Sequence, residues 1–487
     1  MMDKKLIIFD MDGTLNKTET CAAPAILDAL ADMGITSVTK AQVLDTFGAK
    51  DEDTNVRFFG ADAEKMGSVF WKKVSIYMKD RYSECHEAYY GAAKLLKWLK
   101  LHGYTVVVCS NNSSMEHICG TLKKIGLYEW IDRVYPVPVG KTKDEILNVL
   151  LEREQPEWAV MVGDRFYDKE AAKNNGISFA GCLYGYGKAE ELKDADILLE
   201  QITDLIFYLW KKDMTACRLL AFDLDGTLTN SKKELTKETR NLLMKVQQQG
   251  IRIVLASGRP VYGVMPLAEE LELSKYGGYI LAFNGACLFD CFAGETIFSE
   301  NICAEMALEL AGTSKEYSAA LLTYEDDHLV TENSKDCYVI KEASINHMDI
   351  KEVENFENYV NFPMEKCIIA GDKYILEKAE KELQKRFENI LSVYRSEPYF
   401  LEIMAPGIHK AKALAQLLER LHLPKDSLIA FGDGYNDQSM LEFAGLGVAM
   451  ENAADPVKAA ADTVTKNNDS NGVVYALCRL LPTEVVG

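Results

Sequence analysis

The sequence predicts an α/β fold in two halves, each built on a parallel sheet, and two observations lead to this. First, an apolar run ending in Asp-X-Asp-Gly-Thr occurs twice, as "IIFDMDGTLN" at residues 7–16 and as "LAFDLDGTLT" at residues 220–229. A short apolar run that stops at Gly is typical of a buried central strand. Second, such runs alternate with helical patterns in both halves, as expected for parallel strands joined by crossover helices. We therefore expect two Rossmann-like cores, one in each half.

The repeated strand ends in two carboxylates, Asp10 and Asp12 in the first half and Asp223 and Asp225 in the second. Side chains alternate along a strand, so the two carboxylates of a pair lie on the same side of the chain. Ligands of open α/β sheets bind at the carboxyl ends of the strands. Two like charges there favour a cation such as Mg²⁺ beside one carboxylate and acid–base work for the other. A single copy would also fit a solvated acidic turn, but the duplication favours two sites.

The later strands of the first half also lead to polar side chains. The run "YTVVVCSNN" contains Ser110 near its end, and Lys141 precedes a helical pattern. The run "WAVMVGD" ends at Asp164, and Asp168 follows one helical turn later. Taken singly, the serine would more often belong to a turn and the lysine to a solvated helix start. Their order along the chain is what places them at one edge of the sheet.

The second half repeats this order of residues. The run "IRIVLASGR" leads to Ser257, and Lys410 opens the helical pattern "KAKALAQLLERL". The run "SLIAFGDGYND" leads to Asp433, with Asn436 and Asp437 just beyond. The repeated order predicts a second site of the same kind.

The spacing of the lysines selects one candidate in each half. Lys141 and Lys410 each stand 23 residues before the acid that ends the next strand. This equal spacing favours Lys141 over the neighbouring Lys143 in the first half. We therefore expect Lys141 and Lys410 to be equivalent.

Each half carries one large insertion, and the two insertions stand at different points. In the first half, 100 residues separate the first acid from the serine, against 34 in the second half. The first insertion, about residues 16–92, has helical periodicity, so it predicts a helical cap. The second, about residues 284–395, mixes strand-like and helical runs and predicts an α+β cap. The expected domains are residues 1–212 and 213–487.

The composition limits the partners. The chain has 54 basic and 74 acidic residues among 487, a net charge of −20, and 48% of its residues are hydrophobic. A field of this sign repels nucleic acid and anionic membranes, so neither is an expected partner. The 12 cysteines are scattered without a paired motif, as expected for reduced thiols of a cytoplasmic protein. No signal peptide or membrane segment is expected.

With these motifs in place, both halves resemble the haloacid dehalogenase (HAD) superfamily. The first half resembles its phosphoglycolate-phosphatase-like members, which have a helical (C1) cap, also through "YGYGKAEEL". The second half resembles the Cof-type (IIB) branch, which has an α+β (C2) cap, through "FNGA", "LEIMAPGIHKAKAL" and "GDGYNDQSMLEFAGLGVAM". The resemblance is specific in the cores and weak in the caps.

The resemblance implies a role for each motif residue. Asp10 or Asp223 is the expected nucleophile, which forms an aspartyl-phosphate, and Asp12 or Asp225 is the expected acid and base. The residues expected to hold the phosphoryl group are Ser110, Lys141, Ser257 and Lys410. The residues expected to hold Mg²⁺, directly or through water, are Asp10, Asp12, Asp164, Asp168, Asp223, Asp225, Asp433, Asn436 and Asp437. Substrate contacts are implied at Asn111, Arg259 and Asn284, although the last two also fit structural roles.

The function that follows is Mg²⁺-dependent hydrolysis of small phosphorylated metabolites, at two sites. The first site is expected to take phosphoglycolate-like molecules, and the second sugar phosphates or phosphorylated cofactors. One alternative is a phosphotransferase or mutase, which passes the phosphoryl group to an acceptor hydroxyl. Another is that one half is a regulatory module without turnover, although neither half lacks a motif residue.

Overall fold

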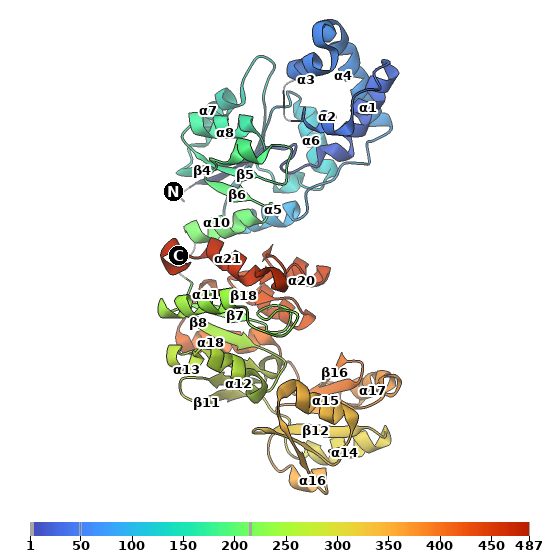
Figure 1. Ribbon diagram of the computed structural model, residues 1–487, viewed down its shortest axis with the longest axis vertical. Helices are drawn as coiled ribbons and strands as arrows, with labels where there is room; N and C mark the ends of the chain where they lie inside the picture. Colours follow the sequence, from blue (N-terminus) through green and yellow to red (C-terminus); the bar gives the residue numbers. More distant parts are fainter. Residues whose placement is uncertain (1–3, 48, 50, 214–216, 487) are drawn as a thin grey trace. The chain divides into compact units, whose positions relative to one another are not determined.

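The computed structural model describes residues 4–47, 49, 51–213 and 217–486 of the chain (Figure 1). These residues form two compact units, Met1–Leu209 and Trp210–Gly487. The boundary falls within helix α10 (Asp204–Asp213). No helix in the described part of the chain combines the length and the apolar character needed to cross a bilayer.

The first unit is built on a six-stranded sheet in the order β3-β2-β1-β4-β5-β6, with all neighbours parallel. The strands are β1 (Lys5–Phe9), β2 (Thr105–Ser110), β3 (Arg133–Pro136), β4 (Trp158–Gly163), β5 (Ser178–Cys182) and β6 (Ile197–Leu199). The central strand β1 is apolar on both faces because helices cover both sides of the sheet. This is the order of a doubly wound α/β fold, so the predicted fold class is confirmed for this half.

Helices of the first unit divide into core and cap. The core helices besides α10 are α5 (Ala92–Leu101), α6 (Met115–Lys124), α7 (Lys143–Glu154), α8 (Phe166–Asn174) and α9 (Ala189–Leu192). The cap helices, dark blue in Figure 1, are α1 (Ala22–Asp32), α2 (Lys40–Leu44), α3 (Asp51–Phe59) and α4 (Ala63–Asp80). Helix α3 begins at Asp51. Its first turn carries three acids, which stabilise the positive end of a helix dipole.

Two short segments tie the helical cap to the core. The Lys17 N–H donates to the Glu87 carbonyl at 2.8 Å, and the Tyr89 N–H donates to the Leu15 carbonyl at 3.0 Å. The chain therefore leaves and re-enters the core through one paired hinge, just beyond Asp12.

The core of the first unit contains a buried acid, Glu154, with three partners. Glu154, the last residue of α7, accepts hydrogen bonds from Lys4 Nζ at 2.5 Å and Tyr135 Oη at 2.9 Å, and also pairs with Arg133. Burial would raise the pKa of Glu154, but these three hydrogen bonds outweigh it and lower the pKa to about 2. The ionised form of Glu154 thus stabilises the folded first unit.

The second unit has an eight-stranded core sheet in the order β11-β10-β9-β8-β7-β18-β19-β20. Its strands are β7 (Leu219–Phe222), β8 (Arg252–Ala256), β9 (Tyr279–Ala282), β10 (Cys287–Asp290), β11 (Glu295–Ser299), β18 (Leu428–Gly432), β19 (Leu446–Ala449) and β20 (Thr463–Val464). The pairs from β9 to β20 are parallel, whereas β10 is antiparallel to both of its neighbours. The helices of this core are α11 (Lys237–Gln248), α12 (Val261–Glu270), α13 (Leu273–Tyr276), α18 (Lys410–Leu421), α19 (Gln438–Phe443), α20 (Asp455–Ala460), α21 (Gly472–Leu480) and α22 (Thr483–Val486).

The cap of the second unit is a separate α+β layer, as predicted. Its sheet has the order β14-β13-β12-β15-β17-β16. The strands are β12 (Ala320–Glu325), β13 (His328–Thr331), β14 (Asp349–Glu352), β15 (Cys367–Ala370), β16 (Ser392–Glu397) and β17 (Phe400–Met404). The helices are α14 (Met306–Glu316), α15 (Cys337–Asn346), α16 (Phe356–Tyr359) and α17 (Lys373–Arg386).

The expected limits of this cap, about residues 284–395, are corrected at both ends. Strands β10 and β11 belong to the core sheet, because short turns fold β10 back as the antiparallel neighbour of β9 and β11 as the antiparallel neighbour of β10. Strand β17 lies inside the cap sheet, where it pairs with β15 and β16, so the cap extends to Met404. Apolar strand patterns alone do not indicate which of two sheets a strand joins.

Candidate active sites

The first site lies at the carboxyl ends of β1, β2 and β4. Asp10 follows β1, Ser110 ends β2 and Asp164 follows β4, and all three side chains are buried. Asp168 lies in the first turn of α8 and is 1% exposed. The predicted gathering of these four residues at one sheet edge is therefore observed.

The lysine of this site is Lys143, and the choice of Lys141 is wrong. Lys143 Nζ lies 2.6 Å from Asp10 Oδ1 and 2.5 Å from Asp168 Oδ1, with the lysine side chain 3% exposed. Lys141 is exposed, and its Nζ pairs with Glu145 at 3.3 Å. The buried ammonium thus bridges two carboxylates, and Lys141 remains at the mouth of the adjoining cavity.

The two halves differ in the length of the connection that follows the lysine-bearing helix. Lys143 and Lys410 are each the first residue of a 12-residue helix. Three residues, 155–157, connect α7 to β4, whereas six residues, 422–427, connect α18 to β18. The lysine-to-acid spacing is therefore 21 residues in the first half and 23 in the second. Counting from the start of the helix, rather than back from the acid, identifies Lys143.

Burial and charge act together on these groups. Burial raises the pKa of Asp10 well above its ordinary value, Lys143 opposes this shift, and Asp168 adds to it. For Lys143, burial would lower the pKa, but the two carboxylates outweigh burial and raise it. Burial, followed by the nearby Asp168, raises the pKa of Asp164 to about 7. The site holds more negative charge than one ammonium neutralises.

Three of these carboxylates are arranged to hold a cation. One oxygen from each of Asp10, Asp164 and Asp168 lies within 4.8 Å of the other two. Magnesium binds oxygen at about 2.0–2.1 Å, so oxygens on opposite sides of the ion lie about 4 Å apart. Asp164 Oδ1 is buried and has no hydrogen-bond partner among the described residues. An unpaired buried carboxylate oxygen beside two others fits a divalent ion.

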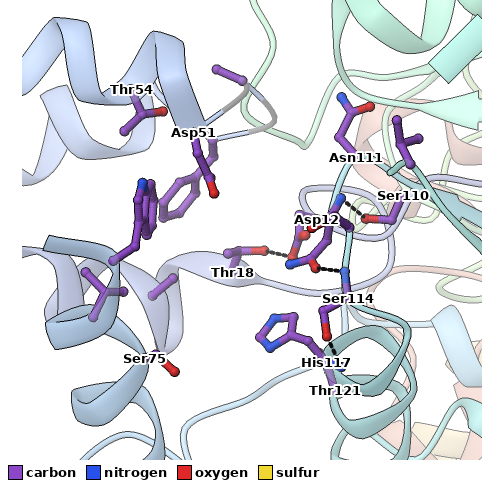
Figure 2. Close-up of a pocket in the computed structure, with 18 of the residues that line it drawn as sticks. Asp12, Thr18, Asp51, Thr54, Ser75, Ser110, Asn111, Ser114, His117 and Thr121 are labelled. Carbon is purple, nitrogen blue, oxygen red and sulfur yellow. Dashed lines mark hydrogen bonds between the residues drawn. The ribbon is translucent and has the colours of Figure 1, made fainter. Parts of the chain in front are cut away.

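Asp12 and Asn111 line the rim of this site (Figure 2). The Asp12 carboxylate accepts hydrogen bonds from Thr18 Oγ1 at 2.5 Å and from Asn16 Nδ2 at 3.1 Å. These bonds hold the Asp12 carboxylate in place at the wall of the cavity. Ser110 Oγ accepts from the Asn112 N–H at 3.2 Å, which leaves the serine proton for another acceptor.

The second site repeats the buried arrangement. Lys410 Nζ lies 2.6 Å from Asp223 Oδ1, 2.6 Å from Asp437 Oδ1 and 2.9 Å from the Ala256 carbonyl oxygen. Burial and Asp437 raise the pKa of Asp223 well above its ordinary value, while Lys410 opposes the shift. The expected Lys410 is therefore in place, and Asp437 corresponds to Asp168.

The metal-type cluster is also repeated. Oxygens of Asp223, Asp433 and Asp437 lie within 4.8 Å of one another. Asp433 Oδ1 accepts from Thr227 Oγ1 at 2.6 Å, and burial is the main cause that raises the pKa of Asp433. The second Asp437 oxygen accepts backbone N–H groups of residues 433 and 434 at 3.0 and 2.8 Å, which fixes its position. These residues fit Mg²⁺ in the same way as the first cluster.

Glycine is required next to both clusters. Gly13 and Gly226 have φ values of +86° and +89°, which side chains with a β-carbon rarely adopt. A β-carbon on Gly13 would also clash with Asp164, and one on Gly226 would clash with Asp433. Glycine therefore lets the loop after β1 approach Asp164, and the loop after β7 approach Asp433.

The remaining predicted residues of the second site lie near its rim. Arg259 Nη2 lies 2.6 Å from Asp225 Oδ2, and Arg259 Nε lies 3.1 Å from the same oxygen. Ser257 Oγ accepts from the Arg259 N–H at 3.1 Å. Asn436 Nδ2 donates to Asn284 Oδ1 at 2.9 Å. Arg259 thus neutralises the expected acid–base residue when no substrate is present.

A chain of polar contacts from the cap reaches this rim. Asn284 Nδ2 donates to Tyr394 Oη at 3.2 Å, and Tyr394 Oη donates to Glu402 Oε2 at 2.9 Å. Lys366 Nζ lies 3.3 Å from Glu402 Oε1 and 3.2 Å from the Gly258 carbonyl oxygen. The sequence pattern did not identify Tyr394, Glu402 or Lys366. Glu402, a charged residue within the apolar strand β17, is the signal that the sequence offers for this network.

Fold and site together define a class: an α/β phosphoryl-transfer enzyme with a carboxylate, a buried lysine and an acidic cation site. A family model described as haloacid dehalogenase-like hydrolase matches residues 220–477, and a second with that description matches residues 7–182. Since the first match spans more than half of the chain, the chain belongs to the haloacid dehalogenase-like hydrolases. The resemblance of both halves to this superfamily is thus confirmed.

Known relatives support a phosphatase. Phosphatase YwpJ of Bacillus subtilis is 32% identical over 292 residues, which cover 54% of this chain and 100% of that protein. A putative phosphatase of Streptococcus pyogenes serotype M6 is 30% identical, covering 53% and 97%. A crystal structure of a haloacid dehalogenase-like hydrolase from Bacteroides thetaiotaomicron is 46% identical, with a TM-score of 0.53, covering 54% and 100%. Each of these covers about half of this chain. The protein is a HAD-type phosphatase.

Proposed function

We propose that both units hydrolyse small phosphomonoesters, each through its own aspartyl-phosphate. The observation that carries this proposal is the same buried arrangement in both units, a lysine between two carboxylates. The two sets are Asp10, Lys143 and Asp168 in the first unit, and Asp223, Lys410 and Asp437 in the second. A regulatory half without turnover would not need to keep this arrangement.

The first chemical step forms a bond from Asp10 or Asp223 to phosphorus. A carboxylate oxygen attacks in line, the bond from phosphorus to the ester oxygen breaks, and the alcohol leaves. Asp12 or Asp225 gives its proton to that leaving oxygen. In the second step Asp12 or Asp225 removes a proton from a water molecule. The water oxygen attacks phosphorus, the bond from phosphorus to Asp10 or Asp223 breaks, and phosphate and the free aspartate are released.

Lysine and serine stabilise charge during both steps. Lys143 or Lys410 holds the nucleophile in place and attracts the phosphoryl oxygens, and Ser110 or Ser257 donates its hydroxyl proton to one of them. In the second site, Arg259 is a further cation beside Asp225, and it releases Asp225 when a phosphate competes for its guanidinium.

We also propose Mg²⁺ as the cofactor of both sites. Asp10, Asp164 and Asp168 would hold it in the first unit, and Asp223, Asp433 and Asp437 in the second, with the Asp12 or Asp225 carbonyl as a further ligand. Bound there, the ion would neutralise the charge between the attacking carboxylate and the phosphate.

The proposed substrates are small phosphorylated metabolites, and nucleic acid and membranes are not proposed as partners because of the net charge of −20. For the second site, sugar phosphates or phosphorylated cofactors remain the proposal. For the first, the sequence resemblance suggests phosphoglycolate-like molecules. The free cysteines support a cytoplasmic location.

The test is a panel of phosphomonoesters with Mg²⁺, using the wild-type chain and the variants Asp10→Asn and Asp223→Asn, singly and together. We expect each single variant to lose a different subset of substrates and the double variant to lose all of them. If Asp10→Asn abolishes every activity and Asp223→Asn none, or the reverse, the proposal of two active sites fails. Measuring phosphate release with and without an added sugar acceptor separates hydrolysis from phosphoryl transfer.

A further inference from the structure

The first active site opens into a large cavity between the helical cap and the core. The cavity has a volume of about 910 Å³. Ligand sites of about 300–1,000 Å³ hold molecules of drug size, so this cavity is near the upper end of that range. A two-carbon acid such as phosphoglycolate would leave most of it filled with water. The cavity therefore has room for an organic group larger than glycolate.

The core wall and the cap wall of this cavity differ in character. The core wall carries the catalytic groups and hydroxyl, amide and imidazole side chains, among them Ser110, Asn111 and His117 (Figure 2). The cap wall carries a set of apolar and aromatic side chains: Ile26, Phe47, Trp71, Val74 and Met78. This wall buries a flat apolar group more favourably than a short charged chain.

Ring contacts hold the two aromatic side chains of the cap wall in place. The Phe47 ring meets the Tyr186 ring edge-on, with centroids 5.0 Å apart. The Trp71 ring packs against Phe70, with centroids 4.8 Å apart. Phe47 and Trp71 are therefore positioned before a substrate enters.

Two polar groups of the cap wall make no hydrogen bond with another residue in the described part of the chain. Trp71 Nε1 is buried and makes no hydrogen bond with any described residue. Asp51, in the first turn of α3, points its carboxylate into the cavity, on the side opposite Asp12 (Figure 2). The contacts of the described residues include no hydrogen bond or ion pair to Asp51. A buried N–H donor requires an acceptor, and the exposed Asp51 carboxylate attracts a cation or a donor that enters the cavity.

We propose that the substrate of the first site is the phosphomonoester of an aromatic nitrogen heterocycle that carries an amino group. This inference rests on the hydrolytic function proposed above. The ring packs against the cap wall, a ring nitrogen or oxygen accepts from Trp71 Nε1, and the amine donates to Asp51. The cavity is also lined by Lys79, Lys124, Lys141 and Arg165, but directly beside Asp51 and Glu52 an amine is favoured over a carboxylate.

The experiment uses the full chain with Asp223→Asn, so that only the first site turns over. Three probes are compared by kcat/KM: pyridoxamine 5′-phosphate, which has the ring and the amine, benzyl phosphate, which has only a ring, and 2-phosphoglycolate. We expect pyridoxamine 5′-phosphate to exceed 2-phosphoglycolate at least tenfold. Asp51→Asn should reduce the ratio of kcat/KM for pyridoxamine 5′-phosphate to that for benzyl phosphate about tenfold. Trp71→Phe, which keeps a ring and removes the N–H, should raise KM for the heterocycle.

The control is Asp53→Asn, which removes a neighbouring acid of α3 that does not line the cavity, and it should leave all three values unchanged. If 2-phosphoglycolate is the best substrate, or Asp51→Asn leaves the ratio unchanged, the inference is wrong while the phosphatase proposal stands. If no probe is hydrolysed in an Asp10-dependent way, the phosphatase proposal for this site fails. Calorimetric binding to the Asp10→Asn chain then decides the inference separately. Tighter binding of pyridoxamine 5′-phosphate than of 2-phosphoglycolate supports it, and the opposite order overturns it.

Discussion

Replacing Lys143 with Met removes the ammonium that joins two buried carboxylates while keeping a side chain of similar length. Asp10 and Asp168 then face each other without their cation, since the ammonium lies 2.6 and 2.5 Å from them. The neighbouring Lys141 offers a matched control two residues away, because its side chain is 56% exposed and pairs with the exposed Glu145.

The structure sets the size of both effects. Breaking a buried ion pair from one side costs about 3–5 kcal/mol. Asp10 has a pKa that burial already raises, so proton uptake limits the loss to about 3 kcal/mol, or roughly 6–12 °C in the Tm of a unit of this size. Loss of a donor that stabilises the transition state lowers kcat about 10²–10³-fold. For Lys141→Met, an exposed i,i+4 pair is worth about 0.3–0.5 kcal/mol, so Tm and kcat should change little.

The assay measures kcat with a substrate of the first site in the Asp223→Asn background, and Tm by calorimetry with the two units' transitions resolved. Lys410→Met serves as the parallel variant for the second site. The reasoning is refuted if Lys141→Met abolishes activity while Lys143→Met keeps it. It is also refuted if Lys143→Met lowers kcat less than about tenfold in a folded protein, since a donor of this kind is worth more.

Three further outcomes are expected. Saturating Mg²⁺ should stabilise the first unit by about 2.7 kcal/mol at 100 times its Kd, and Asp164→Asn should remove most of this shift in Tm. Glu154→Gln should destabilise the first unit by about 1–2 kcal/mol at pH 7, after discounting for partly exposed donors. Folding lowers the pKa of Glu154 to about 2, so its stabilising effect is present above the unfolded pKa and is lost as the pH falls towards 2. If the difference in Tm between wild type and Glu154→Gln persists unchanged at pH 2, this reasoning is wrong. Tyr394→Phe should lower kcat/KM at the second site about tenfold in the Asp10→Asn background. The variant removes the acceptor of Asn284 Nδ2, and Asn284 in turn positions Asn436. An unchanged kcat/KM would show that this contact is structural only.

The parts of both sites that sequence reasoning located are those defined by local chain geometry. Asp10 and Asp223 end apolar strands, and parallel strands bring their carboxyl ends to one edge, so pattern and topology suffice to place them. Asp168 and Asp437 follow their strands by one helical turn, which is also a local relation. The core folds were predictable for the same reason.

The parts that were missed depend on the length of a loop or on pairing between distant segments. The equal spacing does not select Lys143, because the connection from α7 to β4 is shorter than that from α18 to β18. Strands β10 and β11 were assigned to the cap because hydrophobic alternation is the same for either sheet. Glu402 and Tyr394 come together across two strands of the cap, and a spacing rule along one chain does not reveal such a contact.

The two caps are attached to different catalytic groups, and this makes the two sites mechanically unequal. In the first unit the hinge begins just after Asp12, and Thr18 at its start bonds the Asp12 carboxylate, so movement of this cap acts directly on the residue expected to transfer protons. In the second unit the chain leaves the cap at Met404 and soon enters α18, whose first residue is Lys410. A movement of that cap would reach the buried ammonium first. In the proposed mechanism, the first cap is therefore connected to the residue expected to transfer protons, and the second to the lysine beside the expected nucleophile.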